Sequence, residues 1–254
     1  SWRQAIRHGR ALVWLKRDLR LADHVPLAVA SGLGPSAALY ILEPEWLRSA
    51  EFHPRQWAFA RACLTELRSA LAARGLPLIV RVGPAVQVLQ ELHASQGFTH
   101  LLSHEETGPG WTYARDIAVA AWCRERGVQW REWPQHGVVR RLKNRTGWAG
   151  RWAQRMDAAQ EPMPSGWSGW EGVEVGDLPP CEPGAVSILQ EAQGPQPGEQ
   201  AGLRLLEDFL GGRGRGYRRS LSSPLTAESG CSRISAHLAF GALSLRDVHQ
   251  RTEA

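Results

Sequence analysis

Short apolar runs alternate with amphipathic stretches through the first half of the sequence. The apolar runs have the length of strands that are buried on both faces of a parallel sheet; they cover residues 11–15, 37–42, 76–82, 98–103 and 128–133. The stretches between them carry apolar residues at helical spacing, most clearly over residues 55–74 and also over 22–31, 86–93 and 112–126. This alternation predicts an α/β fold with a doubly wound, five-stranded parallel sheet.

The composition changes after the fifth predicted strand. Residues 138–155 hold six basic residues and no acidic residue, with Trp148 and Trp152 four positions apart and therefore on one side of a helix. This stretch predicts either a nucleic-acid contact or an arginine-covered helix that packs its tryptophans against a neighbouring domain. Residues 160–198 are rich in Pro, Gly, Ser and Glu, which is typical of an irregular connection. Apolar periodicity predicts a further helix over residues 199–210.

These changes divide the chain into three parts. We expect an α/β domain over residues 10–135, a basic connector and interdomain linker over 136–198, and a helical segment over 199–254. A chain of 254 residues is long enough to bury a full hydrophobic core.

Charge and cysteine content narrow the class of protein only slightly. The net charge of +5 and the pI of about 9.4 give modest support for an anionic partner. The four cysteines lie 50 or more positions apart, so neither a zinc ribbon nor a dense disulfide framework is indicated. The sequence has no apolar run of membrane-spanning length and no signal-peptide pattern, and these features predict a cytoplasmic protein without membrane contact.

The turn after the first predicted strand is charged, with the sequence Lys16-Arg-Asp-Leu-Arg20. No G-x-G-x-x-G motif and no G-x-x-x-x-G-K-[ST] motif is present, so neither a dinucleotide fingerprint nor a P-loop is indicated. The charged residues favour two interpretations equally: a solvated loop with an internal Arg–Asp pair, or a functional loop at the end of the strand.

A Ser-Arg-x-Ser cluster, Ser232 to Ser235, precedes an apolar periodic run near the end of the chain. Free N–H groups and the dipole at a helix start suit an anionic ligand, and a guanidinium matches phosphate oxygens. Serine is also common at such positions as a simple helix cap. The cluster therefore predicts either a phosphate contact or a cap.

The charged turn belongs to a longer motif that carries a family resemblance. The stretch Trp14-Leu-Lys-Arg-Asp-Leu-Arg-Leu-Ala-Asp23-His24 resembles the opening signature of the photolyase/cryptochrome family. Lys16 replaces the commoner Arg, and His24 stands where Asn is usual. The amino-terminal domain of that family is an α/β domain, in agreement with the hydrophobic pattern.

The Ser-Arg-x-Ser cluster, with His237-Leu-Ala-Phe-Gly241 and Ser244 after it, resembles the flavin motif of the same family. The family uses this cluster and an upstream Tyr to hold the FAD diphosphate, so the resemblance implies FAD as a cofactor. Cys231 stands where Thr is usual, and Ala236 replaces the common Pro. The positions that match, and that we expect to contact FAD, are Tyr217, Ser232, Arg233, Ile234 and Ser235.

The stretch 103–116 resembles the border of the family's antenna-chromophore pocket, with Ala114, Arg115 and Asp116 as matching positions. Thr112 stands where folate-binding members carry Glu, so a folate antenna is disfavoured. A deazaflavin, a flavin and no antenna remain open. We expect the neighbouring Glu105 and Glu106 to be solvated loop acids.

The resemblance implies a flavoprotein that uses light to transfer an electron from FAD to pyrimidine dimers in damaged duplex DNA. The helical FAD-binding domain of the family continues well beyond the length given, so we expect residues 199–254 to be only its beginning, in a fragment or a truncated member. No residue is assigned a catalytic role, and no metal site is predicted. Two alternatives stay open: a cryptochrome-type blue-light photoreceptor with a protein partner, and a flavin-free nucleotide-binding α/β module.

Overall fold

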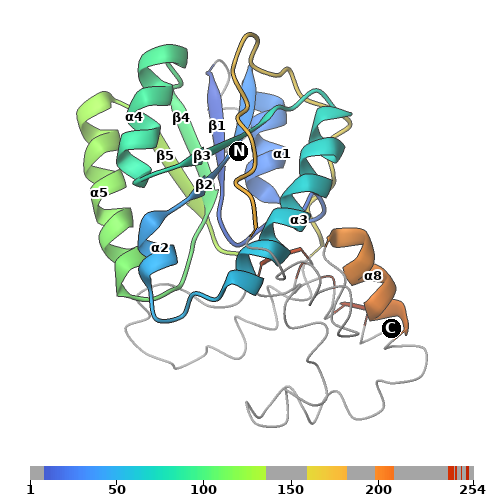
Figure 1. Cartoon of the computed structure of the whole chain (residues 1–254). Coiled ribbons are helices and arrows are strands. Elements are labelled where there is room, and N and C mark those ends of the chain that lie inside the picture. The colour runs from blue at the N-terminus through green and yellow to red at the C-terminus, as the bar shows by residue number, and fades with distance from the viewer. Residues whose placement is uncertain are drawn as a thin grey trace, which may run out of the picture.

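The computed structural model describes residues 9–135, 159–181, 198–208 and 240–242, together with residues 244, 247, 250 and 251. Five strands alternate with helices (Figure 1). The elements in chain order are β1 Ala11–Leu15, α1 Val25–Leu33, β2 Ser36–Leu42, α2 Pro44–Arg48, α3 Pro54–Ala72, β3 Leu78–Val82, α4 Ala85–Gln96, β4 His100–His104, α5 Gly110–Arg126, β5 Gln129–Trp133 and α8 Glu199–Asp208.

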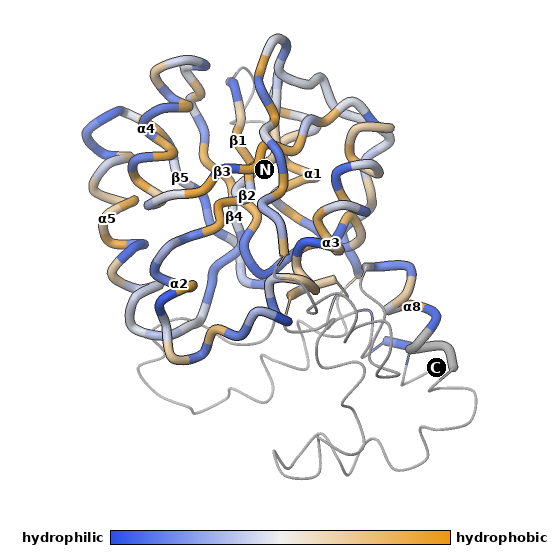
Figure 2. Tube along the Cα trace, viewed as in Figure 1, coloured by the Kyte–Doolittle hydropathy of each residue, from blue (hydrophilic) through white to orange (hydrophobic). Residues whose placement is uncertain are grey.

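The five strands form one parallel sheet in the order β3-β2-β1-β4-β5. Helices α1 and α3 cover one face, and α4 and α5 cover the other (Figure 1). Every residue of β1 is buried, with alternate side chains entering the two cores: Val13 packs towards α1 and α3, and Trp14 towards α4 and α5. Hydrophobic residues gather where strands and helices meet (Figure 2). The predicted doubly wound α/β fold is confirmed.

Local chemistry explains two differences from the predicted elements. Helix α1 begins at Val25, three residues later than the pattern indicated, because His24 caps it and Pro26 occupies its first turn. Asp23 immediately before has a positive φ of 48°, which helical continuation does not allow. Helix α2 was not predicted, because five residues are too few to show a helical period.

The segment 159–181 packs along the α/β domain. The indole N–H of Trp167 donates to the carbonyl of Leu27 at 2.8 Å, and that of Trp170 donates to the carbonyl of Pro35 at 3.2 Å. Both indoles are buried, so each buried N–H has the partner that it needs. None of the helices in the described part of the chain is long and apolar enough to span a membrane.

Candidate functional site

Polar side chains meet at the carboxyl edge of the sheet. Lys16 follows β1, Glu43 follows β2, and His104 is the last residue of β4. The chain runs outward from β1 to β2 and β3 and then returns to the other side of β1 as β4. Ligands of doubly wound proteins bind outside the carboxyl ends of the strands, at this kind of reversal.

A pocket opens at this edge, on the side of β1 and β2. Its volume is about 340 Å³, including the open mouth. Three aromatic side chains and four charged side chains contribute to its wall, which is lined by Leu15, Lys16, Arg17, Tyr40, Ile41, Glu43, Trp46, Glu106 and Trp111. Aromatic walls with a few placed polar groups are typical of small-molecule sites.

Arg115 of α5 forms ion pairs with three acidic side chains at the pocket. Its guanidinium donates to Glu43 at 2.8 Å, to Glu106 at 3.0 Å and to Asp116 at 3.1 Å. Burial lowers the pKa of Arg115, but the three carboxylates outweigh it and leave that pKa above its ordinary value. Glu106 is buried in this ion pair, so the expectation that it is a solvated loop acid is wrong.

Burial also changes the ionisation of Glu43. It raises the pKa of Glu43 to about 7, because the nearby Arg115 offsets only part of the cost of removing the carboxylate from water. Glu43 therefore titrates close to neutral pH. A carboxyl group in this state can either accept or donate a hydrogen bond inside the pocket.

Three buried polar atoms of the pocket have no hydrogen-bond partner among the described residues. They are Lys16 Nζ, Glu43 Oε2 and Trp111 Nε1. Lys16 Nζ lies 4.5 Å from the centre of the Trp14 ring, a cation–π contact that does not replace a hydrogen bond. Unsatisfied buried polar groups are rare and costly in proteins, and these three belong to residues that line the pocket. The lining therefore combines aromatic surface with a few polar groups, as small-molecule sites do.

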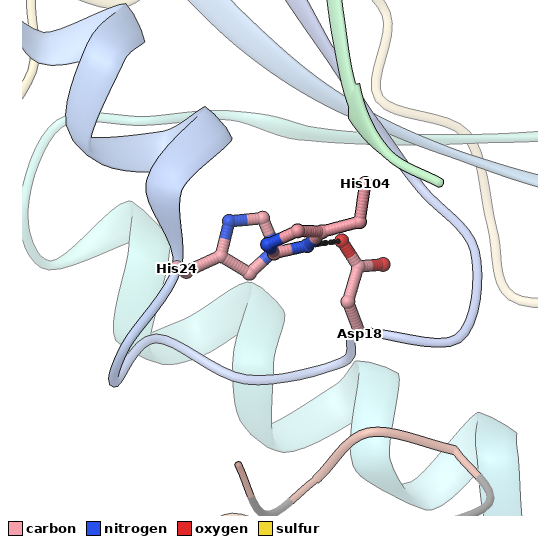
Figure 3. Close-up of side chains that lie close together, drawn as sticks. All are labelled: Asp18, His24 and His104. Atoms are coloured by element: carbon pink, nitrogen blue, oxygen red, sulfur yellow. Dashed lines mark hydrogen bonds and ion pairs between the residues drawn. The ribbon is translucent and has the colours of Figure 1, made fainter. Parts of the chain in front are cut away.

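The loop after β1 is folded around the carboxylate of Asp18. Asp18 is buried, and its Oδ1 accepts the amide of Lys16 at 2.7 Å. Its Oδ2 lies 2.8 Å from His24 Nε2 and 2.8 Å from His104 Nδ1 (Figure 3). The interpretation of this turn as a solvated loop is therefore wrong.

These contacts fix the charge states of Asp18 and His104. Burial by itself would raise the pKa of Asp18, but His24 and His104 outweigh it and hold that pKa well below the ordinary value. Burial and the neighbouring His24 lower the pKa of His104 to about 3, although Asp18 opposes the shift. At neutral pH the pair is therefore a carboxylate beside a neutral imidazole.

The same loop binds a segment from the far end of the chain. The amide of Leu19 donates to the carbonyl of Phe240 at 3.0 Å. The guanidinium carbon of Arg17 lies 5.1 Å from the ring centre of Phe240 and 5.2 Å from that of Trp46. Thus Arg17 touches the pocket wall and the docked segment at the same time.

A hydrogen bond between Asp23 and Ser244 adds to the contact between the α/β domain and the far end of the chain. Ser244 Oγ donates to Asp23 Oδ2 at 2.5 Å, and the amide of Asp247 donates to Ser244 Oγ at 3.4 Å. Ser244 therefore links the backbone of Asp247 to Asp23 of the α/β domain.

The sequence model of the DNA photolyase family, described as DNA photolyase, matches residues 11–148, more than half of the chain. The chain belongs to the DNA photolyase family. The match covers the sheet, the charged loop and the Arg115 ion pairs, so the expected family resemblance is confirmed.

Named relatives include both photolyases and cryptochromes. A deoxyribodipyrimidine photo-lyase from Synechococcus sp. is 26% identical over 265 residues, covering 96% of this chain and 53% of the relative. A cryptochrome DASH from Natronomonas pharaonis is 27% identical over 274 residues, covering 96% of this chain and 56% of the relative. A class III photolyase structure from Agrobacterium tumefaciens superposes with a TM-score of 0.75 at 25% identity, covering 95% of this chain and 52% of the other. The chain thus spans about half the length of these relatives.

The residues expected to contact FAD lie outside the described residues. This holds for Tyr217, Ser232, Arg233, Ile234 and Ser235, and their assignment stays a prediction. Trp148 and Trp152 of the basic connector also lie outside the described part. Of the flavin motif, the structure describes the end, Phe240 to Ala242 and Ser244.

Sequence reasoning missed several residues that build the described site. Glu43 and Trp46 lie outside the motifs, and His104 lies in the stretch 103–116 but is not one of its matching positions. Glu43 and His104 lie at the carboxyl ends of predicted strands, where a ligand site is expected. Listing the polar residues at strand ends would have found these two. Trp46 lies on the short helix α2 and gave no signal.

Proposed function

We propose that the protein containing this chain is a light-driven flavoprotein that transfers an electron from FAD to pyrimidine dimers in DNA and so repairs them. The observation that carries this proposal is the family match over the α/β domain, together with the docking of Phe240 and Gly241 onto the loop after β1. The docked residues end the sequence motif that resembles the flavin site. The chain spans about half the length of the named photolyase relative from Synechococcus sp., so the activity is proposed for the whole protein.

In this proposal the flavin motif holds the diphosphate of FAD. Ser232 and Ser235 supply hydroxyl donors, Arg233 supplies a planar charge that matches phosphate oxygens, and Tyr217 adds a further contact. Ile234 lies between these polar groups in the sequence. When bound, FAD supplies the redox chemistry, while the protein binds and orients it.

The pocket at the carboxyl edge is the proposed antenna site. A deazaflavin or flavin ring fits its chemistry, because carbonyl and N–H groups along a ring edge can pair with Lys16, Glu43 and Trp111. Thr112 supports this preference over folate, since it is buried and its hydroxyl donates to the carbonyl of Pro109 at 2.7 Å. It therefore offers neither a carboxylate nor a free hydroxyl donor to a ligand.

The test compares flavin content and repair in the whole protein. The double variant Arg233→Ala, Ser235→Ala should lose most bound FAD, with loss of blue-light repair of a dimer-containing oligonucleotide. Arg124→Ala on the exposed side of α5 is the matched control and should retain both. Unchanged FAD content in the double variant would reject the phosphate assignment.

The antenna proposal has its own test. Lys16→Met removes the unpartnered ammonium from the pocket and should release a bound antenna chromophore while FAD is retained. Absorption spectra and mass spectrometry of the released molecules separate the two cofactors. An antenna chromophore retained at the wild-type level would reject the assignment of Lys16.

A cryptochrome-type photoreceptor is the second candidate, and the cryptochrome DASH relative favours it. Such a protein would bind FAD but act through a protein partner. Full flavin content without dimer repair under blue light would favour this candidate over the photolyase.

A further inference from the structure

Asp18, His24 and His104 form a buried cluster that the proposed light-driven function does not use. They come from the loop after β1, the residue before α1 and the end of β4. The side chains are 1%, 0% and 4% exposed, respectively. One donor atom from each residue lies within 4.8 Å of the other two, and the three side chains point towards one another (Figure 3).

His24 leaves one ring nitrogen unsatisfied at the centre of this cluster. Its Nδ1 accepts the amide of Leu27 at 3.2 Å, so a neutral ring carries its proton on Nε2. Nε2 lies 2.8 Å from Asp18 Oδ2 but makes no hydrogen bond of good geometry with any described residue. A fully buried nitrogen in this position lacks a partner that is aligned with it.

The Asp18 carboxylate is oriented so that one of its oxygens faces the two histidines. Its Oδ1 accepts the Lys16 amide, and its Oδ2 faces both imidazoles. A ligating carboxylate is commonly held in this way, with one oxygen bound to the protein and the other to a metal ion.

We propose that Asp18, His24 and His104 form a binding site for a divalent transition-metal ion, with Zn²⁺ as the preferred ion. Imidazole and carboxylate are ligands that Zn²⁺ binds at about 2.0–2.2 Å, which places ligand atoms roughly 3.3 Å apart in a tetrahedral site. The two 2.8 Å separations around Asp18 Oδ2 need to widen by only about half an ångström to reach that spacing. A water molecule is the expected fourth ligand.

The ion would tie three elements together. It links the loop after β1 to the start of α1 and to the end of β4, which lie at the edge of the sheet where the pocket opens. Its role is to fix the loop that carries Lys16 and Arg17 into the pocket wall. The three ligands are therefore positioning residues for the pocket.

Binding of the ion would change which ring nitrogen of His24 carries the proton. When Nε2 binds the ion, the proton of the neutral ring moves to Nδ1, and the Leu27 amide loses its acceptor. A cluster held by hydrogen bonds alone keeps that amide bonded. The amide resonance of Leu27 therefore reports which state is present.

The test uses the full chain, stripped of metal with a chelator and then titrated with Zn²⁺ or Co²⁺. We expect one equivalent of Zn²⁺ to bind, a visible spectrum of tetrahedral Co²⁺, and a shift of the Leu27 amide signal. Mg²⁺, which prefers six oxygen ligands, should not compete.

Two matched variants separate coordination from folding. His24→Asn keeps an oxygen that can cap α1 but removes the ligand nitrogen, so the fold should be retained and Zn²⁺ affinity should fall at least about 100-fold. His53→Asn is the control, because His53 caps α3 in the same way but is exposed and outside the cluster.

Equal Zn²⁺ affinity in His24→Asn and the wild type would overturn the proposal. So would a folded wild-type chain that binds no Zn²⁺ and leaves the Leu27 amide unchanged, since the cluster would then be only a buried carboxylate between two imidazoles. Neither result depends on flavin content or DNA repair, so the metal site and the proposed function are tested separately.

Discussion

The buried guanidinium of Arg20 donates a hydrogen bond of 3.3 Å to the carbonyl oxygen of Gly241, which lies 221 positions later in the chain. The same side chain donates to the carbonyls of Ala22 and Asp23, both at 3.0 Å. One residue therefore holds the loop after β1 in shape and fastens the end of the flavin motif to it. This contact connects the α/β domain to the region in which FAD is proposed to bind.

Gly241→Ala should weaken this docking. Gly241 has φ of 63°, and a Cβ there would collide with the backbone of Arg17 and Asp18. We expect a loss of about 2–3 kcal/mol of unfolding free energy, from the strained backbone and the collision together. Chemical denaturation of the purified chain measures it.

The control for this variant is Gly172→Ala. Gly172 has a similar φ of 67°, but a Cβ there meets no atom within 4 Å. Gly172→Ala should lose only about 1 kcal/mol of unfolding free energy, which is the cost of the backbone conformation alone. Equal losses in the two variants would show that the close approach of Gly241 to the loop contributes nothing.

Arg20→Met should destabilise the chain more than a surface substitution. It leaves the carbonyls of Ala22, Asp23 and Gly241 without their buried donor, at a cost of about 3 kcal/mol or more. Arg124→Met on the exposed side of α5 should change the unfolding free energy by less than about 0.5 kcal/mol. Thermal unfolding of both variants tests this, and a shift for Arg20→Met no larger than the control would contradict the contact.

Glu43 should make stability fall as pH rises towards neutrality. Its pKa is about 7 in the folded chain against an ordinary value of 4.5, so between these values the folded chain holds a proton that the unfolded chain has lost. The free energy of unfolding then decreases as pH rises through this window, by up to about 3 kcal/mol. Glu43→Gln should flatten the profile between pH 4.5 and 7, whereas the exposed Glu125→Gln should leave it unchanged. A wild-type slope that persists in Glu43→Gln would assign the proton to another group.

Arg115→Met should be among the most destabilising single changes in the α/β domain. It removes the cation from three buried carboxylates, and breaking a buried pair in this way costs about 3–5 kcal/mol. Adding Glu106→Gln should recover part of the loss, because one uncompensated charge disappears. Denaturant titration of the single and double variants measures the coupling, and strictly additive losses would contradict the shared network.

Most of the sheet could be predicted from sequence because its central strands β1, β2 and β4 are buried on both faces. In β1 every residue is buried, so the run is continuously apolar and distinct from the amphipathic helices beside it. The Trp14 to His24 motif likewise pointed to the family without structural help. The apolar run of β1 and the Trp14 to His24 motif are each formed by residues that are close in the sequence, so a local pattern reveals them.

The pocket and the histidine cluster could not be predicted in the same way. His104 reaches Asp18 only because β4 returns to lie beside β1, which depends on the strand order. Glu106 appeared to be a solvated acid, because its burial depends on Arg115 reaching both Glu43 and Glu106 from α5. Contacts of this kind follow from topology, which a local pattern does not encode.

The most direct test of the proposed function is a visible absorption spectrum of the purified protein, with mass spectrometry of the molecules it releases. We expect a flavin spectrum in the blue, FAD among the released molecules, and bleaching or reduction of that flavin under blue light. A colourless protein that releases no flavin but still binds nucleotides would contradict it, and would favour a flavin-free nucleotide-binding module built on the α/β domain.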